Sequence, residues 1–335
     1  MARGLHDRAV SDLPGVPEVV GTACPVCGGA CARPRFAIEG FASRLVECSD
    51  CGLGRLDPLP SEADLDAHYP DAYYGDPGRK FRGPVEGIVR ILGARHIRFL
   101  SRGVRPGGRL LDVGCGRGVL LSELAERGFE VHGVERSKAA AEGADPRAEI
   151  RIVSRLADAG YRDSFFDAIV IWHVLEHLRE PVETVREIHR ILAPGGKLVV
   201  AVPNFSSLQA KRAGAAWFHL DLPRHVFHFP LAALRRLLVE SGFSIESEHH
   251  FSLRQNPFGE VQSRSNRRSD LPRNGLYTLL HERHPGDPPP FDARTRRRLV
   301  LRGLALAPLA LATTVAETLW RSGATIHVVA RRNAR

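Results

Sequence analysis

The sequence predicts an α/β protein built around a parallel sheet, and three observations support this fold class. Short apolar runs alternate with helix-like segments between residues 109 and 202, a pattern typical of strands joined by crossover helices. The first run, residues 109–113, ends in a turn that contains three glycines. The next run, residues 130–134, is followed directly by Glu135. Open α/β sheets bind ligands at the carboxyl ends of their strands, where the glycines and this acid would lie.

Each expected strand is a short, mostly apolar run, as in sheets that are covered on both faces. The segments between the runs leave room for helices that carry the chain back across the sheet. We expect the strands at 109–113, 130–134, 149–153, 166–172, 196–202, 243–251 and 324–330. We expect the helices at 119–127, 137–142, 181–192 and 231–241, after a helical lead-in at 85–103.

The glycine turn carries the clearest functional signal. Glycine allows the backbone to turn tightly and to approach a ligand closely. Gly114, Gly116 and Gly118 give the spacing GxGxG, which differs from the GxGxxG of dinucleotide sites. Asp112 precedes the turn and suits a cationic ligand, and Glu135 lies 23 residues later, where a nucleoside-binding unit places a carboxylate for ribose hydroxyls. A glycine turn alone would also fit an ordinary strand-to-helix connection.

Two later segments add to this signal. Residues 166–178 read FDAIVIWHVLEHL, and residues 192–204 read LAPGGKLVVAVPN. Together with the glycine turn, they resemble the first, fourth and fifth strands of class I S-adenosylmethionine (SAM) methyltransferases, in the same order and spacing. The resemblance covers residues 85–253 and the last strand. It implies a Rossmann-like, seven-stranded methyltransferase fold with SAM as the cofactor.

The resemblance also implies the cofactor-binding residues. Many relatives carry an acid near the adenine after the third strand, but here Asp158 comes late, so backbone groups around Leu156 are expected to serve instead. His173 follows the fourth strand, in a segment that lines the cofactor cleft in the family. The expected cofactor-binding residues are Asp112, Gly114, Gly116, Gly118, Glu135, Leu156 and His173.

A cysteine module precedes this domain. Cys24 and Cys27 form one CxxC knuckle, Cys48 and Cys51 form a second, and 20 residues separate them. Each knuckle points two thiolates at one place, so the two together complete a tetrahedron around Zn²⁺. We expect a zinc ribbon over residues 21–60 with a structural Zn²⁺, because four cysteines leave no open position for catalysis. Incidental free thiols are the alternative.

Length and composition allow one large domain and a small module in 335 residues. The net charge of +9 is compatible with nucleic acid or an anionic membrane, although only four of the 47 basic residues are Lys. Residues 1–20 contain no apolar leader and are expected to be a flexible tail of a cytoplasmic protein. The main domain is expected over residues 61–253, and residues 323–335 are expected to supply its last strand and a tail.

An insertion separates the last two strands, which form an antiparallel hairpin in the family. Residues 254–322 make up this insertion. Its first part, residues 254–298, is rich in Arg, Pro, Ser and Asn and is expected to be mobile. Its second part, residues 299–320, is apolar, but Arg302, Pro308 and Glu317 argue against a membrane span.

Two interpretations of the apolar part stay open. It forms a helical hairpin packed on the domain or on a dimer partner, or it lies in a membrane interface beside an arginine cluster. The second interpretation makes residues 294–320 a peripheral contact with the inner face of the membrane.

Residues 219–229 carry the candidate catalytic groups, in the loop after the fifth strand where class I enzymes build the substrate site. We expect His225 to act as a general base, with His228 beside it and Arg224 as the anchor of an anionic substrate group. A lid of mutually hydrogen-bonded polar residues is the alternative. A metal site is a less favoured one, and its ligands would be His219, Asp221, His225 and His228. His177 is a further candidate base, with packing or hydrogen bonding as its alternative role.

Three functions fit these features. The first is a SAM-dependent methyltransferase of a small-molecule or lipid-linked metabolite, with a sugar or glycoconjugate precursor as the expected substrate. The second is RNA methylation, because some methyltransferases of ribosomal RNA also carry a zinc module. The ribbon has few basic residues, which disfavours a nucleic-acid partner. The third is a non-catalytic scaffold that binds SAM or has lost it.

Overall fold

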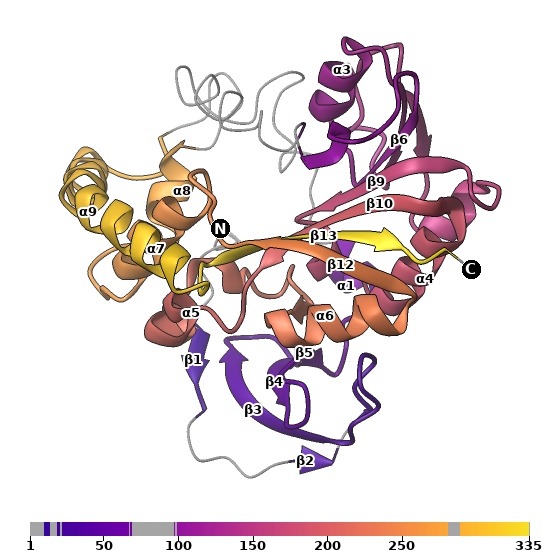
Figure 1. Ribbon diagram of the computed structural model, residues 1–335. Helices are drawn as coiled ribbons and strands as arrows, with labels where there is room; N and C mark the ends of the chain where they lie inside the picture. Colours follow the sequence, from indigo (N-terminus) through magenta and orange to yellow (C-terminus); the bar gives the residue numbers. More distant parts are fainter. Residues whose placement is uncertain are drawn as a thin grey trace.

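A computed structural model describes residues 10–13, 19–20, 22–66, 68, 97, 99–280 and 289–334. Figure 1 shows a large twisted sheet flanked by helices, a small N-terminal sheet below it, and a group of C-terminal helices at one end. Most of the expected lead-in helix at 85–103 lies outside the described residues, although residues 97 and 99–101 are helical.

The large sheet contains the seven expected strands. Its two antiparallel contacts both involve the last strand, which lies between two earlier ones, and the other neighbours are parallel. The apolar runs became central strands because both of their faces are buried. The strand order is β12 (Phe243–His249), β13 (Thr325–Arg332), β10 (Leu192–Pro203), β9 (Phe166–Trp172), β6 (Arg109–Val113), β7 (Glu130–Glu135) and β8 (Glu149–Ile152).

Three expected helices cross this sheet, α3 (Val119–Ala125), α4 (Pro181–Ile191) and α6 (Leu231–Glu240). The expected helix at 137–142 was wrong, because these residues form successive turns. A segment this short gains too few hydrogen bonds to offset the entropy of nucleating a helix. Gly143 then ends it with a φ of +76°.

The small sheet is antiparallel and contains more of the N-terminus than expected. Two short strands lie inside the expected flexible tail and pair with β3, because β3 would otherwise present unpaired backbone groups at its edge. That part of the tail prediction was wrong, and residues 1–9 and 14–18 lie outside the described residues. The strands are β1 (Val10–Asp12), β2 (Val19–Val20), β3 (Cys31–Ile38), β4 (Arg44–Cys48), β5 (Gly54–Asp57) and β11 (Phe227–His228).

The strand β11 ties the small sheet to the main domain. It comes from the loop after β10 and pairs antiparallel with β5, with Phe227 opposite Arg55. The backbone N–H of Leu56 also donates to the carbonyl of Val226 at 3.0 Å. The ribbon therefore braces the loop that carries the candidate catalytic histidines.

The insertion before β13 is largely helical, so the expected mobility of residues 254–298 was wrong where the structure describes them. It forms α7 (Asn256–Asn266), α8 (Gly275–Leu280) and α9 (Ala293–Leu319). Most polar side chains of α7 are buried, and Ser263 shows how they are satisfied: its Oγ accepts from the Phe218 N–H at 2.9 Å and donates to the Gly259 carbonyl at 2.6 Å. The polar composition of this segment predicted mobility, because a partner such as Phe218 lies far from α7 in the sequence and composition does not reveal it.

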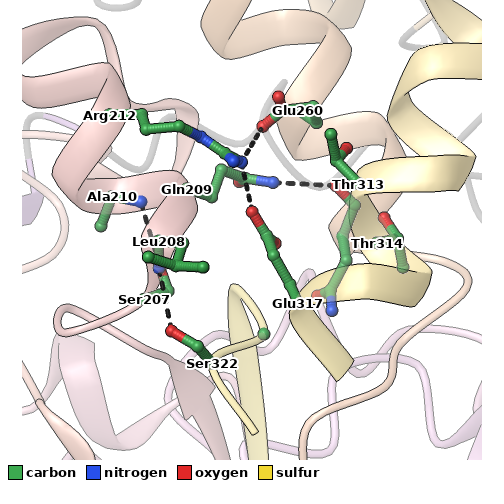
Figure 2. Close-up of polar contacts among 12 residues, drawn as sticks. Ser207, Leu208, Gln209, Ala210, Arg212, Glu260, Thr313, Thr314, Glu317 and Ser322 are labelled. Carbon is green, nitrogen blue, oxygen red and sulfur yellow. Dashed lines mark hydrogen bonds and ion pairs between the residues drawn. The ribbon is translucent and has the colours of Figure 1, made fainter. Parts of the chain in front are cut away.

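The long helix α9 exposes many of its apolar side chains and buries two polar ones. Arg212, on α5 (Leu208–Ala213), pairs with Glu317 of α9 and lies 3.5 Å from Glu260 of α7 (Figure 2). The buried residues of α9 include Thr314 and Glu317. Its exposed residues include Leu301, Leu304, Leu309, Leu311, Val315 and Leu319. An ordinary surface helix buries its apolar side chains, so this exposure is unusual. The segment forms one continuous helix, whereas one of the two expectations was a helical hairpin.

The remaining short helices position the loops of the main domain and the ribbon. They are α1 (Glu62–Asp66), η3 (Leu156–Ala159), η4 (Leu175–His177), η5 (Gly214–Ala216) and η6 (Phe218–Leu220).

Candidate functional site

The glycine turn after β6 has the backbone that its sequence predicts. Gly114, Gly116 and Gly118 have φ values of +75°, +50° and +66°, which side chains strongly disfavour. A Cβ on Gly114 would lie 2.4 Å from Val174 Cγ2, so the turn packs directly against the segment after β9. A Cβ on Gly116 would meet no heavy atom of the described residues within 4 Å. Gly114 thus serves packing, whereas Gly116 leaves the turn open to a ligand.

Glu135 at the end of β7 is fixed to this turn. Its Oε2 accepts the backbone N–H of Gly116 at 2.9 Å. Its Oε1 accepts the N–H groups of Arg136 at 2.8 Å and Ser137 at 3.1 Å. These bonds hold the carboxylate at the mouth of the turn, in the place where ribose hydroxyls bind in α/β nucleoside sites.

Asp112 is buried at the end of β6. Burial, together with the negative charge of Glu135, raises the pKa of Asp112 to about 8. A carboxyl group in such a place gains from a nearby cation, because the cation offsets the lost hydration. The positively charged end of SAM would supply this charge, so the buried acid fits the expected cofactor.

The segment after β9 carries the other expected cofactor residue. His173 has a φ of +53°, and its Nδ1 lies 3.2 Å from Glu176 Oε1. Positive φ is uncommon for a side-chain-bearing residue and marks strain that the surroundings hold in place. Leu156 lies in η3 with its side chain buried, which leaves its backbone as the group for an adenine contact. Both assignments stay predictions.

His225 and His228, in the loop after β10, lie close to His177 in the segment after β9. The rings of His177 and His225 have centroids 4.5 Å apart, and those of His225 and His228 are 6.0 Å apart. His225 Nδ1 lies 2.8 Å from the carbonyl oxygen of His219, and His228 Nε2 lies 3.0 Å from that of Leu220. Backbone carbonyls therefore fix the orientation of both rings.

Burial keeps these imidazoles neutral. It lowers the pKa of His225 to about 3 and that of His228 to about 4. Burial would raise the pKa of Glu176, but hydrogen-bonding and electrostatic interactions, led by those with His173, outweigh burial, and the pKa is lowered to about 2. An imidazole with so low a pKa is a weak base. The predicted role of His225 as a general base therefore needs another group that lowers the pKa of the acceptor.

Arg224 is buried, and its guanidinium donates to Asp221 Oδ1 at 2.5 Å. An anionic substrate group would have to compete with Asp221 for this guanidinium. Its predicted role as an anchor stays a prediction.

The four cysteines of the ribbon meet at one point. Cys24 Sγ and Cys51 Sγ are 3.6 Å apart, and Cys27 Sγ and Cys48 Sγ are 3.5 Å apart. All four sulfurs lie within 4.8 Å of one another. The glycines after the two knuckles, Gly28 and Gly52, have φ values of +75° and +74°. This set of donors has the number and softness that a structural zinc ion requires.

The structure also brings together a second group of possible metal ligands that the sequence analysis does not predict as one set. Glu176, His177 and His225 each offer one ligand atom, and these atoms lie within 4.8 Å of one another. The less favoured alternative joined His225 to His219, Asp221 and His228 instead. The sequence holds a weak signal in the adjacent Glu176 and His177, but only the fold brings them to His225.

Comparison with known proteins agrees with this geometry. Residues 89–248 match the family described as "Methyltransferase domain". A ubiquinone biosynthesis O-methyltransferase of Alkalilimnicola ehrlichii is 37% identical over 107 residues, 29% of this chain and 42% of the relative. A probable SAM-dependent methyltransferase of Mycolicibacterium smegmatis is 32% identical over 143 residues, 41% of this chain and 52% of the relative. The chain thus spans about half of the length of these curated relatives.

A further relative is matched over more of its length. The ubiquinone biosynthesis O-methyltransferase of Maricaulis maris is 29% identical over 199 residues, 52% of this chain and 77% of the relative. Among solved structures, phosphoethanolamine N-methyltransferase 2 of Haemonchus contortus has a TM-score of 0.50 at 17% identity, covering 83% of this chain and 61% of that one. This likeness shows the fold alone. The family match covers residues 89–248, and within them the glycine turn, the fixed Glu135 and most strands of the large sheet form the methyltransferase domain of the class I SAM-dependent type.

Proposed function

We propose that the chain transfers the methyl group of SAM to a hydroxyl oxygen of a small-molecule or lipid-linked metabolite. The observation that carries the proposal is the hydrogen bond from the Gly116 N–H to Glu135 Oε2, which orients a carboxylate at an open glycine turn. Relatives named as ubiquinone biosynthesis O-methyltransferases support an oxygen acceptor. A glycoconjugate precursor is one class of acceptor that carries such hydroxyls.

The residues present fit SAM, which supplies a methyl group already activated on a sulfonium. Glu135 would bind the ribose hydroxyls, Asp112 would face the positive charge, and the backbone of the glycine turn would pass close to the cofactor. The acceptor would bind beside His225 and His228, after β10. SAM would supply the methyl carbon: its bond to sulfur would break with the electron pair staying on sulfur, a bond to the acceptor oxygen would form, and the proton of that oxygen would pass to solvent.

Calorimetric titration with SAM tests this proposal. Replacing Glu135 with Ala removes a charged acceptor of hydrogen bonds worth about 1.5–3 kcal/mol each, so we expect SAM affinity to fall roughly 10- to 100-fold. Glu130→Ala is the matched control, because Glu130 lies at the other end of β7 and pairs with Arg109. Full affinity in Glu135→Ala, or no SAM binding by well-folded wild-type protein, would contradict the proposal.

The four ribbon cysteines would hold a structural Zn²⁺, which suits a module too small to bury a sufficient core. Elemental analysis of the purified protein tests this assignment. Absence of metal together with four reactive thiols would contradict it.

We also propose that α9 holds the enzyme at an anionic membrane surface. Its outward face is largely apolar, with Leu304 67% exposed and Leu319 77% exposed, while Arg212 holds the buried Glu317 inward (Figure 2). The helix is long and apolar enough to cross a membrane, but it runs along α7 and leads into the internal strand β13, which favours an interfacial position. Exposed arginines at its N-terminal end, Arg294, Arg296 and Arg297, match the charge of anionic headgroups.

Vesicle flotation tests the membrane contact. We expect binding to vesicles that contain anionic lipid and a loss of binding in Leu304→Glu, because a charge on the apolar face opposes insertion. Val239→Glu is the control, since Val239 is 56% exposed on α6, away from α9. Equal flotation of the two variants, or none by the wild type, would contradict the proposal.

A further inference from the structure

We propose that Glu176, His177 and His225 form a second metal site, which binds a divalent transition-metal ion such as Zn²⁺ beside the SAM turn. One ligand atom from each lies within 4.8 Å of the others. Glu176 and His177 belong to η4, directly after β9, and His225 comes from the loop after η6. We call these three residues the Glu-His-His cluster.

The two imidazoles are held in the state that a metal requires. His177 Nδ1 lies 3.1 Å from the carbonyl oxygen of Arg224, and His225 Nδ1 lies 2.8 Å from that of His219. A carbonyl oxygen can only accept a hydrogen bond, so each Nδ1 carries the proton and donates. Each Nε2 then bears a lone pair in place of a proton, and Nε2 of His225 lies 3.8 Å from Asp221 Oδ2. A backbone carbonyl behind each ring is the usual outer partner of a metal-ligating histidine.

The carboxylate supplies the second, independent observation. Glu176 is 1% exposed, and its Oε1 is engaged by His173. Its Oε2 is buried and has no hydrogen-bond partner among the described residues. A buried carboxylate oxygen without a partner is costly, and a cation between it and two imidazoles would provide the missing interaction.

The donor set indicates the class of metal. Two imidazole nitrogens and one carboxylate oxygen favour Zn²⁺ or another first-row divalent ion over Mg²⁺, which prefers oxygen ligands alone. Three protein ligands leave at least one position open, as in catalytic zinc sites. The structural cysteine site, by contrast, uses all four positions.

The location suggests what the open position would bind, and this step rests on the proposed function. Val174, two residues before Glu176, packs against Gly114 of the SAM turn. A hydroxyl oxygen of the acceptor bound to the ion would have a lowered pKa and lose its proton to solvent more readily. His225 would then act as a ligand, which accounts for a buried imidazole in a position where the sequence suggested a base.

Metal stoichiometry tests the site directly. The full chain is stripped with a chelator, reloaded with Zn²⁺, freed of excess metal and analysed for zinc per chain. We expect two equivalents in the wild type and one in Glu176→Gln and in His177→Gln. His189→Gln is the matched control and should keep two, because His189 is a similarly half-buried histidine on α4, outside the cluster. Loading with Co²⁺ identifies the lost site, since only the cysteine site shows absorption from thiolate-to-cobalt charge transfer.

Two results would overturn the inference. One is a single equivalent in reloaded wild-type protein with a folded ribbon. The other is a second equivalent that survives both Glu176→Gln and His177→Gln. If the buried Glu176→Gln variant fails to fold by circular dichroism, the half-buried His177→Gln variant decides the outcome alone. SAM titration of His177→Gln separates this inference from the proposed function, because failure of the metal site would leave SAM binding intact.

Discussion

The two metal-capable clusters of this chain are built in different ways. The cysteine cluster comes from two knuckles within one small module, and each knuckle places its pair of thiols by local backbone geometry. The Glu-His-His cluster joins η4 to a loop about 50 residues later, through the hydrogen bond from the Val226 N–H to the Glu176 carbonyl at 2.9 Å. Local spacing can therefore reveal the first, whereas only the fold reveals the second.

The difference extends to what each cluster does for stability. The ribbon is small, and its buried apolar side chains join the core of the main domain, so a zinc ion would be a main part of what holds the ribbon itself together. The Glu-His-His cluster lies among fully buried residues such as Leu175 and Val226, which pack with or without an ion. Loss of the cysteine site should therefore damage the fold more than loss of the Glu-His-His cluster.

We expect Cys48→Ser to have the largest effect. Cys48 is 1% exposed, and loss of its thiolate should release the zinc and unfold the ribbon, at a cost of more than about 4 kcal/mol. Because β5 pairs with β11, hydrogen exchange should also rise at residues 227–228. Exchange measured by mass spectrometry checks this, with Cys31→Ser as the control outside the cluster. Unchanged exchange at β11 in the Cys48 variant would show that the ribbon does not brace the histidine loop.

Gly114→Ala should have an intermediate effect, because it disturbs the contact between the SAM turn and the segment that carries Glu176. The new Cβ would lie 2.4 Å from Val174 Cγ2 at a φ of +75°. Strain and overpacking together should cost about 2–4 kcal/mol, measured by chemical denaturation. Both SAM affinity and zinc binding at the Glu-His-His cluster should fall.

Gly116→Ala is the matched control for this variant. Its φ is +50°, but its Cβ would meet no described heavy atom within 4 Å, so we expect a loss of only about 1–2 kcal/mol. The Gly116 variant should weaken SAM binding while leaving zinc binding unchanged. Equal effects of the two variants on zinc would mean that Val174 does not couple the turn to the cluster.

The sequence was most informative where interactions are local. The glycine turn, the strand β9 and the CxxC knuckles each depend on neighbouring residues, and their predicted positions agree with the structure. The seven-stranded fold followed from the order of such segments. The boundaries of β6 and β9 could be read closely because apolar runs end where glycine or polar residues begin.

The misses share one physical cause, which is a partner distant in the sequence. The composition of α7 predicts a mobile segment, whereas the structure orders it, because its buried Ser263 accepts a hydrogen bond from Phe218, 45 residues earlier. The strands β1 and β2 form only because β3 offers them an edge. The grouping of Glu176 and His177 with His225 depends on the fold in the same way, since these residues meet only after the loop folds back against η4.

The smallest effect on stability is expected from removing the metal of the Glu-His-His cluster alone. A site with three protein ligands and an open position should exchange with a chelator before the closed cysteine site does. Dialysis against a weak chelator should therefore leave one zinc per chain, and by mass action the fold should lose about 0.8 kcal/mol if free zinc had been near three times the dissociation constant. Calorimetry on each sample checks this, with His177→Gln as the control that should show no change on dialysis. Release of the cysteine-bound zinc first would reverse the contrast between a closed structural site and an open one.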